Sequence, residues 1–156
     1  MANETRDIHR PFALRAATQA DFRAIKSLIH TVGINPTGLD WRRFAVAVKP
    51  EGELVGCGQL KPHRDGSHEL ASIAVIREMR GKGVARAIIE RLLTEHTGDV
   101  YLTCRASLGP LYRKFGFRTA EVAEMPRYFR TVKRFANLIQ RLGIMEEGLL
   151  VMKREG

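Results

Sequence analysis

Residues 75–89 read VIREMRGKGVARAII, and this stretch decides the fold. It begins at the end of a mostly apolar run, His68 to Ile76, which predicts a central strand. Gly81 and Gly83 then open a segment with apolar residues at helical spacing, which predicts a helix from Gly81 to about His96. The first N–H groups of a helix lack carbonyl partners and lie at the positive end of its dipole, so this turn suits a phosphate.

The turn also combines positive charge with backbone freedom. Arg80, Lys82 and Arg86 surround it, and its two glycines let the main chain approach a bulky anion. It is not a Walker A loop, because no Gly-Lys-Ser/Thr ends it, and the fingerprint G-x-G-x-x-G would need glycine at Arg86. An ordinary surface turn before a helix has a similar composition, so a functional interpretation needs a second motif.

A second motif lies further along the chain, and both motifs resemble those of one family. The spacing Val75-x4-Arg80-x-x-Gly83-x-Ala85 resembles the acetyl-CoA signature of the GNAT acetyltransferases, V-x4-Q/R-x-x-G-x-G/A. The stretch LYRKFGF at residues 111–117 resembles their second hallmark, FYxKxGF, and a predicted helix and strand separate the two motifs. The central half of the chain is therefore similar to the GNAT superfamily.

Length and composition predict one soluble domain. The chain has 156 residues, of which 44% are hydrophobic, and we expect a single GNAT-like domain over residues 1–156 with residues 1–10 as a loose lead-in. No apolar run is long enough for a bilayer and the first residues are polar, which predicts a cytoplasmic protein with no membrane contact. Cys57 and Cys104 lack metal-site spacing, so we expect buried free thiols and no metal.

The positive charge is concentrated in the last third of the chain. The formal net charge is +9. Between Arg105 and Arg141, nine Lys and Arg residues face only Glu121 and Glu124, a local net charge of +7. Such a field attracts coenzyme phosphates, acidic acceptors or nucleic acid.

The order of predicted elements indicates the α+β class, with a mixed central sheet of about six to seven strands flanked by helices in three layers, as the GNAT resemblance implies. The predicted strands cover residues 12–16, 44–48, 54–60, 68–76, 100–104, 117–123 and 149–152. The predicted helices cover residues 18–32, 81–96, 108–115 and 126–142, and Thr18 with Asp21 has the spacing of a capping box.

The helix over residues 126–142 departs from the family pattern, which places little between the last two strands. Its apolar stripe is predicted to face inward and comprises Tyr128, Val132, Phe135, Ile139 and Leu142. Its basic face comprises Arg127, Arg130, Arg134 and Arg141. This basic face is either simply solvated or a wall of the acceptor cleft that favours acidic partners.

The resemblance implies the residues that bind the coenzyme. The pyrophosphate would rest on the backbone amides of Arg80, Gly81, Lys82, Gly83, Val84 and Ala85. The pantetheine arm would pair with the backbone of Ile73, Ala74 and Val75, where an amide would also polarise the thioester carbonyl. Many members have asparagine where this chain has Arg105, so no asparagine role is carried over.

The resemblance also implies two catalytic residues, Glu69 and Tyr112. Glu69 would be the general base, acting through water; His63 and His68 are alternatives, because an imidazole titrates near neutral pH. Without that role, Glu69 would be a solvated or salt-bridged carboxylate. Tyr112 would protonate the leaving thiolate, or else be a core tyrosine with its hydroxyl at the rim.

We therefore expect an acetyl-CoA-dependent N-acetyltransferase that moves an acetyl group directly to a primary amine. The acceptor would be a small molecule or a peptide, of which the basic face of the 126–142 helix favours an acidic one, and a homodimer stays open. One alternative is a nucleic-acid-binding module built on the basic C-terminal third, which is disfavoured because Tyr128 and Phe135 fall on the predicted inward stripe. Another alternative is a catalytically silent GNAT domain that only binds acyl-CoA.

Overall fold

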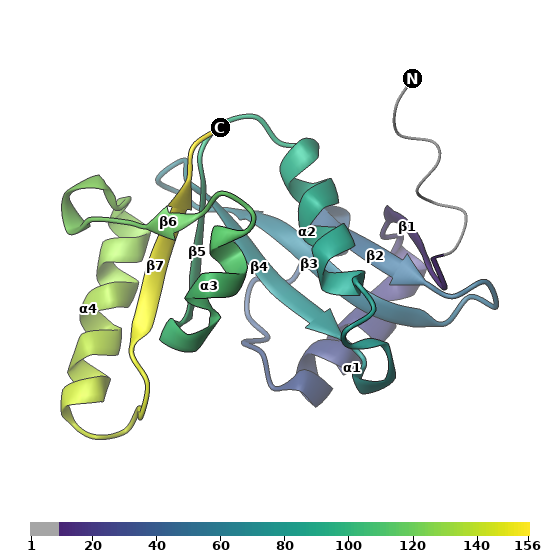
Figure 1. The fold of residues 1–156 in the computed structure, drawn as a ribbon, viewed down its shortest axis with the longest axis horizontal. Coiled ribbons are helices and arrows are strands. Elements are labelled where there is room, and N and C mark those ends of the chain that lie inside the picture. The colour runs from purple at the N-terminus through teal and green to yellow at the C-terminus, as the bar shows by residue number, and fades with distance from the viewer. Residues whose placement is uncertain (1–9) are drawn as a thin grey trace. The chain divides into compact units, whose positions relative to one another are not determined.

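The structure, a computed structural model, describes residues 10–156, so the predicted lead-in lies, apart from Arg10, outside the described residues. Seven strands form one mixed sheet in the order β1-β2-β3-β4-β5-β7-β6, and four α-helices accompany them in this part of the chain (Figure 1). This confirms the α+β class. The chain divides into two compact units, which we call unit 1 (up to Gln59, with Ser72–Leu93) and unit 2 (Leu60–Ala71 with Thr94–Gly156). The single domain over residues 1–156 stays a prediction.

The bounds of the elements mostly follow the predicted ones. The strands are β1 Ala13–Ala16, β2 Phe44–Val48, β3 Leu54–Pro62, β4 His68–Val75, β5 Val100–Arg105, β6 Arg118–Thr119 and β7 Leu149–Arg154. The α-helices are α1 Phe22–Val32, α2 Val84–Thr94, α3 Gly109–Arg113 and α4 Arg127–Arg141. None of the helices in residues 10–156 combines the length and the apolar character needed to cross a membrane.

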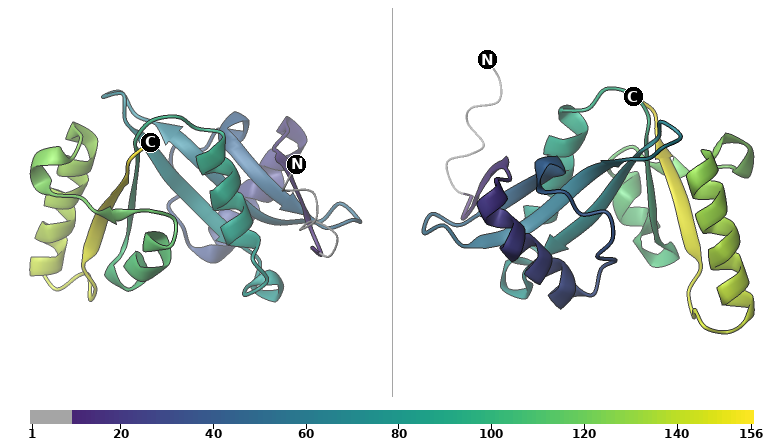
Figure 2. Two further views of the ribbon diagram at one scale, coloured as in Figure 1. Left: turned by 45° about the horizontal axis from the view of Figure 1, so that its top comes forward. Right: turned by 180° about the vertical axis from the view of Figure 1, so that it is seen from behind.

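In unit 1, α1 and α2 cover opposite faces of β2 and β3 (Figures 1 and 2). The core under α1 contains Ile25, Leu28, Ile29, Phe44, Val46, Cys57 and Ala74. On the other face, Gly56 and Gly58 let α2 pack directly on the backbone of β3, because a Cβ atom at Gly56 would lie 2.6 Å from Cγ1 of Val84. A side chain at either glycine would therefore push α2 away from the sheet.

The predicted capping box at the start of α1 is confirmed. The backbone N–H of Thr18 donates to Oδ2 of Asp21 at 2.7 Å, and a 3₁₀ turn over Gln19–Asp21 leads into the helix. Arg15 also donates two hydrogen bonds to the Asp21 carboxylate, at 2.6 and 2.9 Å. The Arg15 hydrogen bonds, with those from Thr18, lower the pKa of Asp21 from its usual 3.8 to about 2.

In unit 2, β7 lies between β5 and β6 and is antiparallel to both. The core on the α4 side contains Tyr101, Ala120, Met125, Phe129 and Val151. The residues of β7 that alternate with Val151 face α3: a Cβ atom at Gly109 would lie 3.0 Å from Cδ1 of Leu150. Because the strands alternate their side chains, unit 2 also places its strands between two helices.

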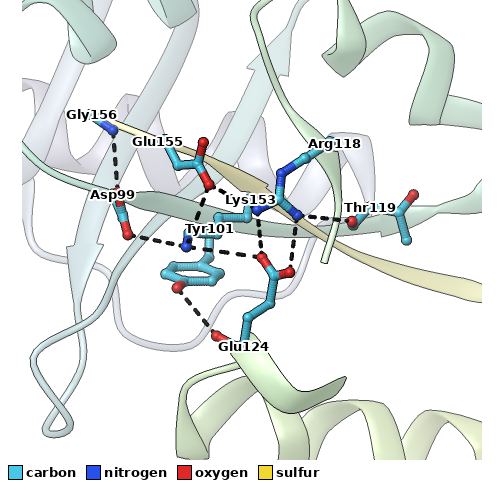
Figure 3. A network of polar contacts seen from close by, with 8 residues as sticks. All are labelled: Asp99, Tyr101, Arg118, Thr119, Glu124, Lys153, Glu155 and Gly156. Carbon is cyan, nitrogen blue, oxygen red and sulfur yellow. Dashed lines mark hydrogen bonds and ion pairs between the residues drawn. The ribbon is translucent and has the colours of Figure 1, made fainter. Parts of the chain in front are cut away.

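A network of polar side chains joins the strands of unit 2 to the turn before α4 (Figure 3). Arg118 of β6 contacts the carboxylates of Glu124 and Glu155, at 2.8 and 2.9 Å. Lys153 of β7 lies 3.3 Å from Asp99 and 3.9 Å from Glu124. Since Glu124 precedes α4 in the chain, the network helps to fix where that helix begins.

Two predicted elements are shorter in the structure. The helix predicted from Gly81 begins at Val84, because Gly81 and Gly83 have φ angles of 75° and 81°, in the left-handed region that a right-handed helix excludes. The strand predicted over residues 117–123 is reduced to β6, because the chain turns into a 3₁₀ turn at Val122–Glu124.

The predicted inward stripe of α4 is only partly right: Tyr128, Val132 and Ile139 are partly buried, and Tyr128 packs against the core of unit 2. Phe129 is fully buried and Ala136 is buried, whereas Phe135 is 65% exposed and Leu142 is 66% exposed. The buried face is thus rotated relative to the predicted stripe, and Phe135, Leu138 and Leu142 form an exposed apolar strip. Phe135 therefore no longer counts against nucleic-acid binding.

Candidate functional site

In unit 1, the segment between β4 and α2 forms an open turn. A 3₁₀ turn over Arg77–Met79 follows β4, and the two left-handed glycines bring the chain to the start of α2. The carbonyl of Gly83 accepts the first helical hydrogen bond, from the N–H of Ala87 at 3.0 Å. No atom would lie within 4 Å of a Cβ atom at Gly81 or Gly83, so the space beside these glycines is free. The chain just before the start of α2 therefore has free space beside it, as an anion site requires.

A hollow of about 610 Å³ adjoins this turn, between α1 and the end of β4. It is lined by Ala24, Ser27, Leu28, Thr31, Val32, Leu54, Val75, Ile76, Arg77, Glu78 and Arg80. Nε of Arg80 donates to the carbonyl of Val75 at 3.4 Å, which holds this cation against the end of the strand. The hollow thus combines an apolar strand end with two cations, Arg77 and Arg80, and one carboxylate, that of Glu78.

The backbone of β4 bends at Ser72, which the sequence does not indicate. Ser72 is the one described non-glycine residue with positive φ, at 59°. Its hydroxyl accepts a hydrogen bond from Nε2 of the fully buried Gln59 at 3.0 Å. A left-handed serine inside a strand is strained, and such strain often marks a functional site. It immediately precedes Ile73, Ala74 and Val75, the residues expected to contact pantetheine.

All nine residues predicted to bind the coenzyme thus lie in unit 1, within one continuous segment of the chain. Ala74, Val75 and Val84 are buried, and Ile73 and Ala85 are partly exposed. Residues 80–83 are exposed. The strand residues can therefore offer mainly backbone groups, while the turn can offer both backbone amides and the side chains of Arg80 and Lys82.

In unit 2, Glu69 pairs with His63. Oε2 of Glu69 lies 2.7 Å from Nε2 of His63, and the two side chains are only 9% and 10% exposed. Glu69 is therefore a buried, hydrogen-bonded carboxylate rather than a solvated one. If Nε2 carries the proton that it shares with Glu69, the Nδ1 atom of the imidazole is free to accept another.

Tyr128 and Asp65 hold the imidazole of His63 in place, and the sequence pointed to neither role. The ring of Tyr128 stacks on His63 at 3.6 Å between centroids, and Phe129 contacts its edge. Asp65 accepts the backbone N–H of Tyr128 at 2.9 Å, which ties the loop of His63 to the start of α4. Burial raises the pKa of Asp65, but hydrogen bonds from Ser67 and Tyr128 outweigh it and lower the pKa to about 2.

A hollow of about 510 Å³ opens beside this pair. It is lined by His63, Arg64, Asp65, Arg127, Tyr128 and Thr131. His63 lines the hollow and Glu69 does not, so a molecule in the hollow would meet the imidazole, with the carboxylate behind it.

His68 is separated from this pair. It precedes Glu69 in β4, so its side chain points to the opposite face of the strand. Its ring lies 4.5 Å from that of His96, and burial together with His96 lowers its pKa. The structure therefore favours His63 over His68 as the histidine that acts with Glu69.

Tyr112 lies in α3, also in unit 2. Its ring packs edge-on against Phe117, with the centroids 6.2 Å apart. Gly116 ends the turn after α3 with a φ of 85°, as expected for this motif. Burial, with a smaller effect of Cys104, raises the pKa of the Tyr112 hydroxyl. The phenol is therefore protonated at neutral pH, as a general acid must be.

A profile of the acetyltransferase (GNAT) domain matches residues 40–119, just over half of the chain. The chain belongs to the GNAT family. The matched part of this GNAT domain includes β4, the turn before α2, and α3. A comparison with curated proteins gives no match.

Solved structures of similar fold include three bacterial proteins. Rv2747 from Mycobacterium tuberculosis, solved in complex with CoA and NLQ, has a TM-score of 0.71 and 24% identity, over 92% of this chain and 99% of that one. N-acetylglutamate synthase from Neisseria gonorrhoeae, with coenzyme A and N-acetyl-glutamate, gives 0.67 and 19%, over 92% and 35%. Escherichia coli ElaA gives 0.65 and 19%, over 92% and 99%. At these identities the similarity establishes the fold of this GNAT protein.

Proposed function

We propose that this GNAT protein is an acetyl-CoA-dependent N-acetyltransferase that transfers the acetyl group directly to a primary amine. The observation that carries the proposal is the turn before α2, where two left-handed glycines leave free space beside the N-terminus of a helix. The pyrophosphate would accept hydrogen bonds from the amides of residues 80–85, and Arg80 and Lys82 would add charge. The pantetheine arm would pair with the backbone of residues 73–75, beyond the bend at Ser72.

Glu69 and His63 would act together as the general base. The imidazole takes a proton from the acceptor ammonium, and the Glu69 carboxylate orients the ring and stabilises its charged form. The freed amine lone pair attacks the thioester carbonyl carbon, whose oxygen accepts a hydrogen bond from a backbone amide of residues 73–75. As the C–S bond breaks, Tyr112 donates its proton to the departing thiolate, and the nitrogen of the new amide gives up its second proton to the tyrosinate.

The acceptor would be the amine of a small molecule or peptide that also bears acidic groups. Arg64 and Arg127 line the hollow beside His63 against one carboxylate, that of Asp65, so its net positive charge would attract a carboxylate and repel a polyamine. N-acetylglutamate synthase, among the structures of similar fold, has been solved with coenzyme A and N-acetyl-glutamate, which carries two carboxylates. Spermidine should therefore be a poorer acceptor than glutamate or an acidic peptide.

Coenzyme binding is tested by placing a negative charge beside the turn. Gly83→Glu puts a carboxylate where the pyrophosphate would lie, so acetyl-CoA should raise the melting temperature of the wild type and not of this variant. Gly52→Glu is the matched control, because Gly52 also has positive φ and free space around it but lies in the β2–β3 turn. Equal stabilisation of both variants by acetyl-CoA would contradict the proposed placement.

Acetyl transfer is tested separately from binding. CoA release from acetyl-CoA is measured with a panel of amines, and the acetylated product is identified by mass. Thermal stabilisation by acetyl-CoA without amine-dependent CoA release would instead support the catalytically silent alternative.

A further inference from the structure

The first two turns of α4 carry positive charge, and the Asp65 carboxylate beside their start accepts the backbone N–H of Tyr128 instead of pairing with an arginine. The exposed arginines there, which we call the arginine row, are Arg127, Arg130 and Arg134. Within residues 10–156 the guanidinium groups of the row form no ion pair. Elsewhere in unit 2 the guanidinium of Arg118 contacts two carboxylates (Figure 3). Three unpaired cations on neighbouring turns repel one another, so an anion among them is stabilising.

Two hollows lie along the arginine row. The first is the 510 Å³ hollow beside His63. The second, of about 350 Å³, is lined by Arg127, Arg130, Thr131 and Arg134. Because Arg127 and Thr131 line both, the hollows adjoin each other along α4. From Arg127 to Arg134 the helix rises by about 10 Å, so together they form an extended site.

The two ends of this site differ in chemistry. At one end His63, with Glu69 behind it and Tyr128 stacked on it, can remove a proton from an amine. At the other end Arg130 and Arg134 can only bind anions. A molecule that occupies the whole site therefore has an amine at one end and negative charges spread over the following 10 Å or so.

We infer that the acceptor is a peptide whose reactive amine is followed by several acidic residues. The inference rests on the proposed acetyl transfer and specifies its acceptor. A free amino acid carries its carboxylates close to its amine, so it would reach Arg127 and leave Arg130 and Arg134 without an anion. In an extended peptide, side chains on one side recur about every 6.8 Å, so two or three carboxylates span the arginine row.

The rings around the hollows favour a peptide over a nucleic acid. Single-stranded nucleic acids bind by stacking bases on free aromatic rings. Tyr128 is the one phenyl or phenol ring among the described residues that line the two hollows, and His63 already stacks on it at 3.6 Å. The exposed Phe135 lines neither hollow.

Binding is measured by fluorescence anisotropy without acetyl-CoA, so that the result does not depend on catalysis. The probe is a short peptide with a free N-terminus, three Glu residues and a C-terminal fluorophore; a second probe has Gln in place of Glu. We expect the wild type to bind the Glu probe about tenfold more tightly than the Gln probe. Arg134→Gln should lower the affinity for the Glu probe by about two- to fivefold, the range for one exposed ion pair.

Arg141→Gln is the matched control. It removes the same charge from the same helix, and Arg141 is exposed but lines neither hollow. We expect it to change the affinity for the Glu probe by less than about 1.5-fold, through the general field alone. Equal weakening by Arg134→Gln and Arg141→Gln, or equal affinity for the two probes, would overturn the inference.

Two further arms separate the remaining outcomes. The first arm uses a labelled single-stranded oligonucleotide of equal charge. If it binds more tightly than the Glu probe, and Arg134→Gln lowers its affinity, the inference is overturned in favour of a nucleic-acid surface. In the kinetic arm, a lower KM for the Glu peptide than for free glutamate supports the inference. Transfer to glutamate and to both peptides with equal KM would overturn it while leaving the proposed function intact.

Discussion

The hydroxyl of Tyr112 combines burial with a raised pKa, so it holds its proton at neutral pH. If it protonates the leaving thiolate, Tyr112→Phe should lower kcat by roughly 10²-fold or more, the scale of general acid catalysis. The dissociation constant of acetyl-CoA should stay within about twofold, because the ring and its packing on Phe117 are kept. An unchanged kcat would exclude Tyr112 as the acid.

Glu69 and His63 are expected to act as one unit, because their side chains share a 2.7 Å hydrogen bond away from solvent. His63→Gln removes the proton acceptor and should abolish the acidic limb of the kcat/KM–pH profile. Glu69→Gln keeps a hydrogen-bonding group behind the ring but removes its charge, so it should lower kcat. The control is His68→Gln, which should leave the profile unchanged because His68 lies on the opposite face of β4.

The pair of His63 and Glu69 could be predicted from the sequence only in part. Spacing and resemblance pointed to Glu69 and offered His63 as an alternative, but neither indicates that the two side chains touch. That contact depends on the loop after β3 folding back along β4 and on α4 supplying Tyr128. His63 and Glu69 are six positions apart, but Tyr128 is more than 60 positions from this loop, and no local pattern encodes its contact with His63.

At the scale of the element, α4 offers a test with two phenylalanines on one helix. Phe129 is fully buried and Phe135 is 65% exposed. Phe129→Ala should therefore cost about 3–5 kcal/mol of unfolding free energy, because it leaves a cavity in the core of unit 2. Phe135→Ala should change it by less than about 0.5 kcal/mol. Urea unfolding followed by circular dichroism measures both, and a large loss for Phe135→Ala would favour the stripe predicted from the sequence.

The sequence predicted the existence of α4 correctly and its buried face only in part. Two apolar sets with helical spacing coexist on it, one containing Phe129 and Ala136 and the other containing Phe135 and Leu142. Periodicity finds both, and only packing against Tyr101 and Val151 decides which is buried. The start of α2 was misplaced for a different reason. Gly81 continues the helical spacing, but its backbone is left-handed, and composition does not reveal a φ angle.

At the scale of the whole molecule, each unit contains one aspartate whose pKa is lowered to about 2: Asp21 in unit 1 and Asp65 in unit 2. A carboxyl whose pKa is lower in the folded than in the unfolded state stabilises the fold above its unfolded pKa, near 3.8, and loses this contribution as the pH falls toward 2. Both units should therefore lose stability between about pH 4 and pH 2.

The corresponding variants test this assignment. Asp21→Asn and Asp65→Asn should each lower the urea midpoint at pH 7 and reduce the further loss between pH 4 and pH 2, because the titrating group is gone. Glu51→Gln, at an exposed position of the β2–β3 turn, serves as the control. If the loss of stability in acid is the same in the aspartate variants as in the wild type, other groups carry the acid sensitivity.

The homodimer and the cytoplasmic location stay predictions.

The two cysteines of the chain are both buried, and this has a practical consequence. Burial raises the pKa of Cys57 to about 12 and also raises that of Cys104. A disulfide dye reacts with thiolates that it can reach, so the folded protein should stay colourless in its presence. Colour that develops during turnover then comes from the released coenzyme alone. In urea, two thiols per chain should react with the dye as the protein unfolds. One reagent can therefore follow both the release of the coenzyme and the unfolding of the protein.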